Sequence, residues 1–410
     1  MTVRVSKPAF NLRDKLSELD KPTGLKGSEL MRSDTSQDAR NVIGAGRKNK
    51  VINGGMIISQ RGSSFSGITG NAGDTYTLDR FKLQTNNLDQ AVATVSQDSS
   101  APDGFSKSLK IQCTTAETSV ESSEHARLIY DGEAYDFTDV GFGTKSAKRI
   151  TVSFWVKSNL TGIWGMNFWR GDANRSNLRT YTINNANTWE HKVITLSADT
   201  TGGVVNSDNG HGFRLNWGLA TGANFATSHA LDTWHGFQQQ YFYPYDARNT
   251  NFFSSTSNTF YLTGVQCEVS DVATEFEHRP YTEELALCQR YYWKPFPGSN
   301  STTFDTIMIA MKVADTDGGR SGSTFFPVMM RAAPSVVFED RAADYGGTTT
   351  AQRVTCQHHN GTYAHGVTWS WATTPWGCDG PYHYPYGISG FTKGDVGNFQ
   401  CNKLEFIAEL

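Results

Sequence analysis

Residues 264–292, GVQCEVSDVATEFEHRPYTEELALCQRYY, form the joint around which the chain is organised. The stretch begins with the alternation of a strand, because Val265, Cys267 and Val269 fall two residues apart. Ser-Asp then turns the chain, and Pro280 excludes a helix immediately before it. The first half therefore predicts the last strand of a β-rich unit, followed by a turn.

The second half of the joint has the pattern of a short helix. Glu283 and Glu284 fall in its first turn, where acidic side chains interact favourably with the positive end of the helix dipole. The residues expected to form its apolar face are Tyr281, Leu285, Cys288 and Tyr292. We predict a helical connector over residues 281–293 that leads into a second, smaller β-rich unit.

The chain before the joint alternates like a series of short strands. The clearest is RITVSFWVKS (149–158), in which apolar residues occupy every second position. Further strands are expected at 51–62, 75–85, 90–97, 108–113, 127–131, 162–170, 180–183, 190–196, 213–219 and 259–269. Strands every 10 to 15 residues without long helices between them predict an all-β fold, an antiparallel jelly-roll β-sandwich over residues 51–280.

A smaller C-terminal β domain is expected over residues 294–410. Its clearest strands are predicted at 306–313, 324–330, 334–340 and 403–410. The other helical patterns lie in residues 1–50, at NLRDKLSELD and TSQDARNVIG, and neither is long enough to build a core by itself. We interpret residues 1–50 as a short helical N-terminal anchor that needs another surface.

Charge supports a separate role for this leader. Residues 1–50 hold eleven Lys and Arg against six Asp and Glu, whereas the whole chain has a net charge of −3. A basic leader on an acidic body fits either a docking segment or a solvated tail. The overall charge argues against nucleic-acid binding, and with no signal peptide and no run of about 18 apolar residues we expect synthesis in a cytoplasm and no membrane insertion.

No catalytic motif is present, and we predict neither an enzyme nor a cofactor. Asp172, Asp232 and Glu275 could form a glycosidase pair only at a separation that a sequence cannot supply. The Cys and His residues between 356 and 383 match no standard zinc spacing, and DANRSN (172–177) lacks the glycine and the distal glutamate of a calcium loop, so no metal is predicted. The six cysteines form no CxxC pair, and we interpret most of them as buried thiols.

Aromatic residues are the most informative feature of the loops. Sugar rings stack on such side chains, but tryptophans also fill cores, as Trp155 would, or subunit contacts. The aromatic stretches 235–258 and 363–386 are too polar or too long for ordinary connections. The residues predicted to contact glycans or other subunits are Trp164, Trp169, Trp217, Trp234, Tyr243, Trp369, Trp371, Trp376, Tyr382 and Tyr384.

The joint also carries a family resemblance. The segments ATEFEHRPY (273–281) and ELALCQRYY (284–292) resemble a block of tail-fibre-like virion structural proteins of tailed bacteriophages, especially marine ones. The leader 10–49, the element NGGMIISQRG, the strands ITVSFWVKSNLTG and NTWEHKVITL, and FPVMMRAAPSVVF look like further parts of such proteins. The loops 235–258 and 363–386 depart from the pattern.

The resemblance implies a non-enzymatic virion component with a carbohydrate-binding-like jelly roll, often a homotrimer. Residues 1–50 would dock on other virion proteins, and the β units would be displayed on a tail fibre or related appendage for attachment to a host cell-surface polysaccharide or other receptor. The alternatives are a purely structural collar or head-decoration subunit and a glycan-cleaving appendage. No catalytic residue is carried over by the resemblance.

Overall fold

The computed structural model describes residues 47–236, 243–244, 250–295, 309–315, 318–321, 326–339, 353–358, 363–372, 382–386, 396–400 and 403–410. The chain divides into two units, Met1–Asn49 and Lys50–Leu410. The helices predicted in the leader lie outside the described residues, so its role as an anchor stays a prediction.

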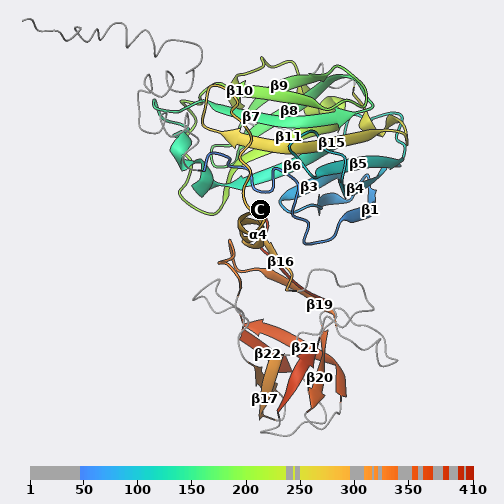
Figure 1. Cartoon of the computed structure of the whole chain (residues 1–410), viewed down its shortest axis with the longest axis vertical. Helices are drawn as coiled ribbons and strands as arrows, with labels where there is room; N and C mark the ends of the chain where they lie inside the picture. The colour runs from blue at the N-terminus through green and yellow to red at the C-terminus, as the bar shows by residue number, and fades with distance from the viewer. Residues whose placement is uncertain are drawn as a thin grey trace, which may run out of the picture. The chain divides into compact units, whose positions relative to one another are not determined.

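The second unit begins with an antiparallel β-sandwich, as the sequence predicts (Figure 1). One sheet has six strands, in the order β1 (Ser64–Thr69), β4 (Val92–Asp98), β5 (Ser108–Thr115), β15 (Thr259–Glu268), β7 (Ile150–Ser158) and β10 (Glu190–Leu196). The other has seven, in the order β13 (Trp234–Gly236), β9 (Arg175–Ile183), β8 (Gly162–Arg170), β11 (His211–Thr221), β6 (His125–Glu133), β3 (Phe81–Asn86) and β2 (Gly73–Tyr76).

Short elements complete the sandwich. A parallel pair joins β12 (Ala226–Thr227) to β14 (Tyr243–Pro244). Among the described residues, 3₁₀ helices span Ala134–Val140, Ala223–Phe225 and Phe252–Ser254.

The core lies between the two sheets and follows the alternation of the sequence. In β7, Ile150, Val152, Phe154 and Val156 are fully buried in this core, whereas Trp155 and Lys157 are half-buried on the other face. Burying one such side chain stabilises the fold by about 1.5–3 kcal/mol, so the alternation determines which face of each strand points inward.

The predicted strand at 51–62 is wrong. Residues 51–61 form turns and coil, with Asn53 and Met56 in the left-handed region at φ 60° and 57°. The Asn53 side chain holds this turn, since its amide nitrogen donates to the carbonyls of Ile58 and Asp79, both at 2.9 Å, and its oxygen accepts from the Ile58 N–H at 2.9 Å. Asparagine tolerates the left-handed region and bonds the local backbone, so a turn replaces the strand.

The joint contains the strand and the helix that the sequence predicts, with a different buried face on the helix. β15 ends at Glu268, and α4 spans Tyr281–Gln289. Tyr281 is exposed, at 57 %, and Tyr292 lies beyond the helix in β16. The buried helix residues are Glu284 and Cys288, four residues apart. A carboxylate can occupy this face because hydrogen bonds replace its lost hydration.

After the helix, the chain forms a three-stranded antiparallel sheet and a closed barrel. The sheet has the order β16 (Tyr292–Trp293), β24 (Lys403–Ile407) and β19 (Ser335–Glu339). The barrel consists of β17 (Ile309–Asp315), β18 (Gly318–Ser321), β22 (Tyr382–Tyr386), β21 (Tyr363–Ala372), β20 (Arg353–His358) and β23 (Val396–Gln400) (Figure 1).

One predicted strand of this region is wrong over its described part. Residues 326–330 form no strand, and Pro327 would leave a gap in a hydrogen-bonded ladder. Phe326 instead packs edge-on against Trp293 and Phe406, with ring centroids 5.5 and 5.0 Å apart.

Candidate functional site

The outer face of the six-stranded sheet carries a row of aromatic and polar side chains. Trp155 and Lys157 on β7 face away from the core, and the antiparallel register places Thr263 and Tyr261 of β15 opposite them. On the far side of β15, Lys110 of β5 lies opposite Tyr261. The alternation that fills the core therefore also gathers the half-buried Trp155, Lys157, Tyr261 and Lys110 on the outer side of the sheet, whereas Thr263 is fully buried.

Lysine side chains lie against the aromatic rings of this face. The Lys157 ammonium is 4.1 Å from the Tyr261 ring centroid and 5.0 Å from that of Trp189, and it donates to Ser100 Oγ at 2.6 Å. Lys110 lies 5.5 Å from the Tyr261 centroid. Burial against these rings lowers the pKa of Lys157. These cation–π contacts hold the rings of Tyr261 and Trp189, whose centroids are 6.1 Å apart, in fixed positions.

The row continues from Trp155 towards the joint. The Trp155 ring lies 5.1 Å from that of His191 on the neighbouring strand β10. On its other side is a bulge of β15 that contains Gly264, at φ +62°. A Cβ at this glycine would lie 2.7 Å from Phe105 Cζ and 3.0 Å from Trp155 Cδ1, so both rings approach the bare backbone. Glycine is required here by the left-handed conformation and by the close contact.

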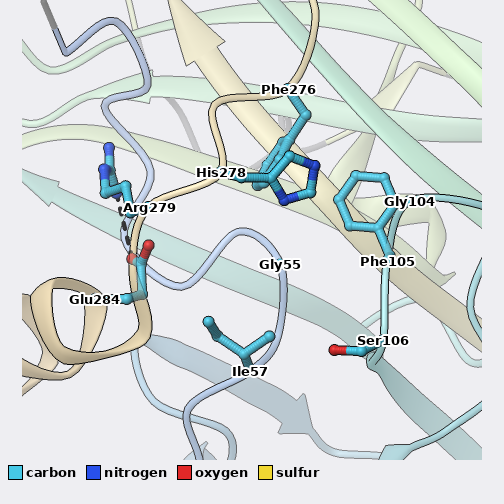
Figure 2. A pocket seen from close by; sticks show the side chains of 9 residues that line it. All are labelled: Gly55, Ile57, Gly104, Phe105, Ser106, Phe276, His278, Arg279 and Glu284. Atoms are coloured by element: carbon cyan, nitrogen blue, oxygen red, sulfur yellow. Dashed lines mark hydrogen bonds and ion pairs between the residues drawn. The ribbon is translucent and has the colours of Figure 1, made fainter.

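Beyond Phe105 the surface opens into a pocket of about 370 Å³ (Figure 2). Its aromatic wall consists of Phe105, Phe276 and His278, whose ring centroids lie 4.9–5.3 Å from one another. Ile57 forms an apolar side, and the exposed Ser106 lies at the rim. The pocket therefore combines ring faces with polar groups, which is typical of small-molecule sites.

An ion pair forms the polar end of this pocket. Arg279 Nη1 donates to Glu284 Oε1 at 3.3 Å and to the Val51 carbonyl at 3.0 Å. The same Glu284 oxygen accepts the Asn53 backbone N–H at 2.5 Å. Both charged side chains are nearly buried, with 5 % and 8 % of their side-chain surface exposed. Hydrogen bonds of this kind hold the pair in one geometry.

The structure places three of the predicted tryptophans inside the sandwich. Trp164 and Trp217 are fully buried in the core, so the prediction of an exposed contact is wrong for them. Trp234 is 9 % exposed, and its indole N–H donates to the Ser197 carbonyl at 2.8 Å, which also makes it a core residue. Each lies on the inward face of its strand, where the apolar area that a ring buries outweighs any use at the surface.

The remaining predicted residues lie elsewhere. Trp169 is half-buried on β8, in the opposite sheet, with Arg214 4.9 Å from its ring. The backbone places Tyr243 on β14, and the neighbouring barrel strands carry Trp369 and Trp371 on β21 and Tyr382 and Tyr384 on β22. Trp376 lies outside the described residues. Contacts of the tyrosines and of the barrel tryptophans with glycans or subunits stay predictions.

The residues that form the aromatic row were missed, although the sequence contains a signal for one of them. Trp155 was weighed as a core residue, yet it shares the polar half of the RITVSFWVKS alternation with Lys157. No local pattern in the sequence indicates that Trp189 and Tyr261 meet, because the two residues are about 70 positions apart in the chain. Phe105 and Phe276 are brought together in the same way.

Among the described side chains, no group of three or more His, Cys, Asp or Glu is arranged to hold a metal ion. In the part of the chain that the structure describes, no helix has the length and apolarity needed to cross a membrane.

Comparisons with known proteins return structural neighbours only. No protein-family model matches the sequence, and no curated protein matches it. The enzymatically active domain of bacteriophage CBA120 tailspike protein 4 is 11 % identical, with a TM-score of 0.28; the alignment covers 54 % of this chain and 21 % of that chain, about a fifth of the tailspike domain's length.

Two bacterial structures align over similar lengths. The family 11 carbohydrate-binding module from Clostridium thermocellum, in complex with a β-1,3-1,4-mixed-linked tetrasaccharide, is 10 % identical, with a TM-score of 0.24 and coverage of 53 % and 98 %. The CBM22-1–GH10 modules of xylanase 10B from the same organism, complexed with xylohexaose, are 11 % identical, with a TM-score of 0.24 and coverage of 49 % and 28 %. All three TM-scores are below 0.5, so these structures carry no argument about the fold. The assignment of a β-sandwich comes from the strand order described above.

Proposed function

We propose that this protein binds glycans on the outer face of its six-stranded sheet. One observation carries the proposal: the rings of Trp155, Tyr261 and Trp189 are half-buried on the outer side of the sheet, and Lys110 and Lys157 lie against Tyr261 and Trp189. Aromatic faces stack on the C–H faces of sugar rings, and nearby donors take the hydroxyl oxygens. The rigid sheet holds the rings in place before binding, which lowers the entropy lost on association.

The biological setting that we propose follows from the resemblance of the 264–292 block. The chain would be a non-enzymatic structural protein of a phage virion, a tail fibre or related appendage, which displays its β units to a host-surface polysaccharide. Residues 1–50 would dock on other virion proteins, and the oligomer would be a homotrimer. The expected location is the outside of the virion.

Glycan arrays and purified host lipopolysaccharide test the binding. Trp155→Ala and Tyr261→Ala should each weaken binding about tenfold, because aromatic contacts of this kind contribute about 1–1.5 kcal/mol. Tyr135→Ala is the control, since it removes an exposed aromatic ring from the 3₁₀ helix Ala134–Val140, outside the six-stranded sheet. Binding that is unchanged in both face variants would contradict the proposal.

The second function is a purely structural one, in which the same rings contact another chain. It is favoured by the cation–π packing, which also suits a protein interface. Sedimentation of the Trp155→Ala variant separates the two: dissociation of the oligomer with no glycan binding by the unaltered chain would support the structural role. A third possibility, glycan cleavage, is tested by the release of reducing ends from host polysaccharide.

Deletion of residues 1–48 tests the anchor. The remaining chain keeps the whole sandwich, which begins at the turn around Asn53, and should be a folded oligomer that no longer joins particles. Normal incorporation of this truncated chain into virions would contradict the anchor role.

A further inference from the structure

The pocket at the joint is separate from the aromatic sheet face, although the two meet at Phe105. It is lined by side chains from three distant parts of the chain: the turn that contains Ile57, the loop that contains Phe105 and the joint itself (Figure 2). Its volume of about 370 Å³ falls in the range of about 300–1,000 Å³ that is typical of small-ligand sites.

The two carboxylate oxygens of Glu284 differ in their hydrogen bonds: Oε1 accepts two, and Oε2 can still accept one from a ligand. The Asn53 N–H, at 2.5 Å, and Arg279 Nη1, at 3.3 Å, both donate to Oε1. Among the described residues, no donor reaches Oε2, although the residue is only 6 % exposed and lines the pocket. Oε2 is not among the enclosed polar atoms that lack a partner in the described part of the chain, so it stays accessible from the pocket and a ligand hydroxyl can donate to it.

The opposite side of the pocket presents ring faces. Phe276 packs T-shaped against both Phe105 and His278, so the cluster is rigid, and Phe105 and Phe276 are only half-buried. A flat molecule with C–H groups on its faces and hydroxyls at its edge matches such a pocket, because it can contact the rings while its hydroxyls reach the carboxylate.

The charged side chains at the polar end of the pocket favour a neutral ligand over an anionic one. Arg279 pairs with Glu284 and lies 3.8 Å from a Glu277 carboxylate oxygen, so two acidic groups surround one guanidinium. An anionic ring would be repelled here, in contrast to the sheet face with its lysines. We propose that this pocket binds a single neutral hexopyranose ring, with hydroxyl groups donating to Glu284 Oε2 and a ring face against Phe105 and Phe276. The choice of a sugar rests on the proposed glycan-binding function.

Saturation-transfer NMR and calorimetry on the full chain test this inference. The probes are the methyl hexopyranosides of glucose, galactose and mannose, with the methyl glycoside of glucuronic acid as the charged counterpart. At least one neutral probe should bind saturably, and the glucuronide should bind about tenfold more weakly or worse, by repulsion from Glu284.

Two pocket variants and a control locate the binding. Glu284→Gln keeps an acceptor for Asn53 and removes the charge, and it should weaken binding of the neutral probe about tenfold, the value of a charge-assisted hydrogen bond. Ser106→Trp fills the pocket from its exposed rim and should abolish binding even if Glu284→Gln fails to fold. Glu275→Gln, an exposed site in the same segment, is the matched charge control and should bind normally.

The outcomes distinguish this inference from the proposed function. Loss of monosaccharide binding in Ser106→Trp, with array binding lost only in Trp155→Ala and Tyr261→Ala, supports both. No binding of any neutral probe, or binding unchanged in Ser106→Trp, overturns the pocket assignment while array binding by the sheet face can still stand. If monosaccharide binding is lost in Ser106→Trp and the sheet face binds no glycan, the pocket assignment is supported and the proposed function of the sheet face is contradicted.

Discussion

Arg290, the residue after α4, forms a two-pronged ion pair with Glu133 at the end of β6. Nε and Nη2 of the arginine donate to Oε1 and Oε2 of the carboxylate at 2.7 and 2.8 Å. The Glu133 side chain is 3 % exposed and that of Arg290 is 29 % exposed. This pair joins the end of the connector helix to the sandwich.

Arg290→Ala should lower the free energy of unfolding of the sandwich by about 2–4 kcal/mol, because it leaves a buried carboxylate without its partner. Urea denaturation followed by tryptophan fluorescence measures the loss. Arg149→Ala is the control, since its pair with Asp271 is 3.5 Å long and exposed, and it should cost less than about 1 kcal/mol. Equal losses in the two variants would show that burial of Glu133 has no energetic consequence.

Gly264→Ala should destabilise the protein by about 2–4 kcal/mol. The added methyl would meet Phe105 and Trp155 at 2.7 and 3.0 Å, in addition to the strain of φ +62°. Gly67→Ala has the same backbone strain, at φ +71°, but no atom within 4 Å of the new Cβ, and should cost only about 1 kcal/mol. If the Gly264 variant were no less stable than the Gly67 variant in urea, the close approach of the two rings would be disproved.

Acid should destabilise the sandwich through His125. Burial, followed by repulsion from Arg127, lowers the pKa of His125 to about 3, from an ordinary value of 6.5. The ring is 4 % exposed and packs on Phe225, with centroids 4.3 Å apart. Between pH 6.5 and 3 the unfolded chain binds a proton that the folded chain does not, so stability falls as the pH drops, by roughly 2.7 kcal/mol down to pH 4.5.

The comparison of the unaltered chain with His125→Gln isolates this contribution from that of the carboxylates. Urea midpoints measured from pH 7 to pH 4.5 should fall less steeply in the variant. Parallel pH profiles of the two proteins would show that His125 is not the titrating group.

Three cysteines should resist thiol reagents in the native protein. Cys113, Cys267 and Cys288 are free and buried, and burial raises the pKa of Cys113 to about 11, that of Cys267 to about 12 and that of Cys288 well above its ordinary range. The reactive thiolate is therefore scarce and inaccessible. In a variant with serine at positions 356, 378 and 401, Ellman's reagent should detect no thiol until guanidinium is added, and then three. Rapid labelling of the native variant would contradict the burial of these thiols.

Several strands of the sandwich could be predicted because they repeat a local rule. Apolar residues at every second position of 149–158 and 259–269 bury one face of each strand, and both segments are strands of the six-stranded sheet. Pro280 likewise predicted the start of α4. The turn at 51–61 could not be predicted in this way, because the bonds of Asn53 to Ile58 and Asp79 override an apolar run.

For the candidate site, the sequence predicted the type of residue, aromatic, but not which aromatic residues lie at the surface. Aromatic residues at the surface were expected, but for Trp164 and Trp217 burial prevailed, while Trp155 faces outward. Period-two alternation separates two faces without saying which of them is covered, so it cannot rank one tryptophan above another.

By itself, the sequence determined the all-β class, many of the strands and the connector helix, because these depend on residues within a few positions of one another. Only the tertiary structure decided which side chains meet. Tyr261 reaches Lys157 and Lys110 through the pairing of strands about 100 to 150 residues apart, and Glu284 reaches Asn53 across 231 residues. Contacts of that range depend on the packing of the whole sandwich, where register, a single left-handed glycine and the burial of one carboxylate determine the surface that a ligand would meet.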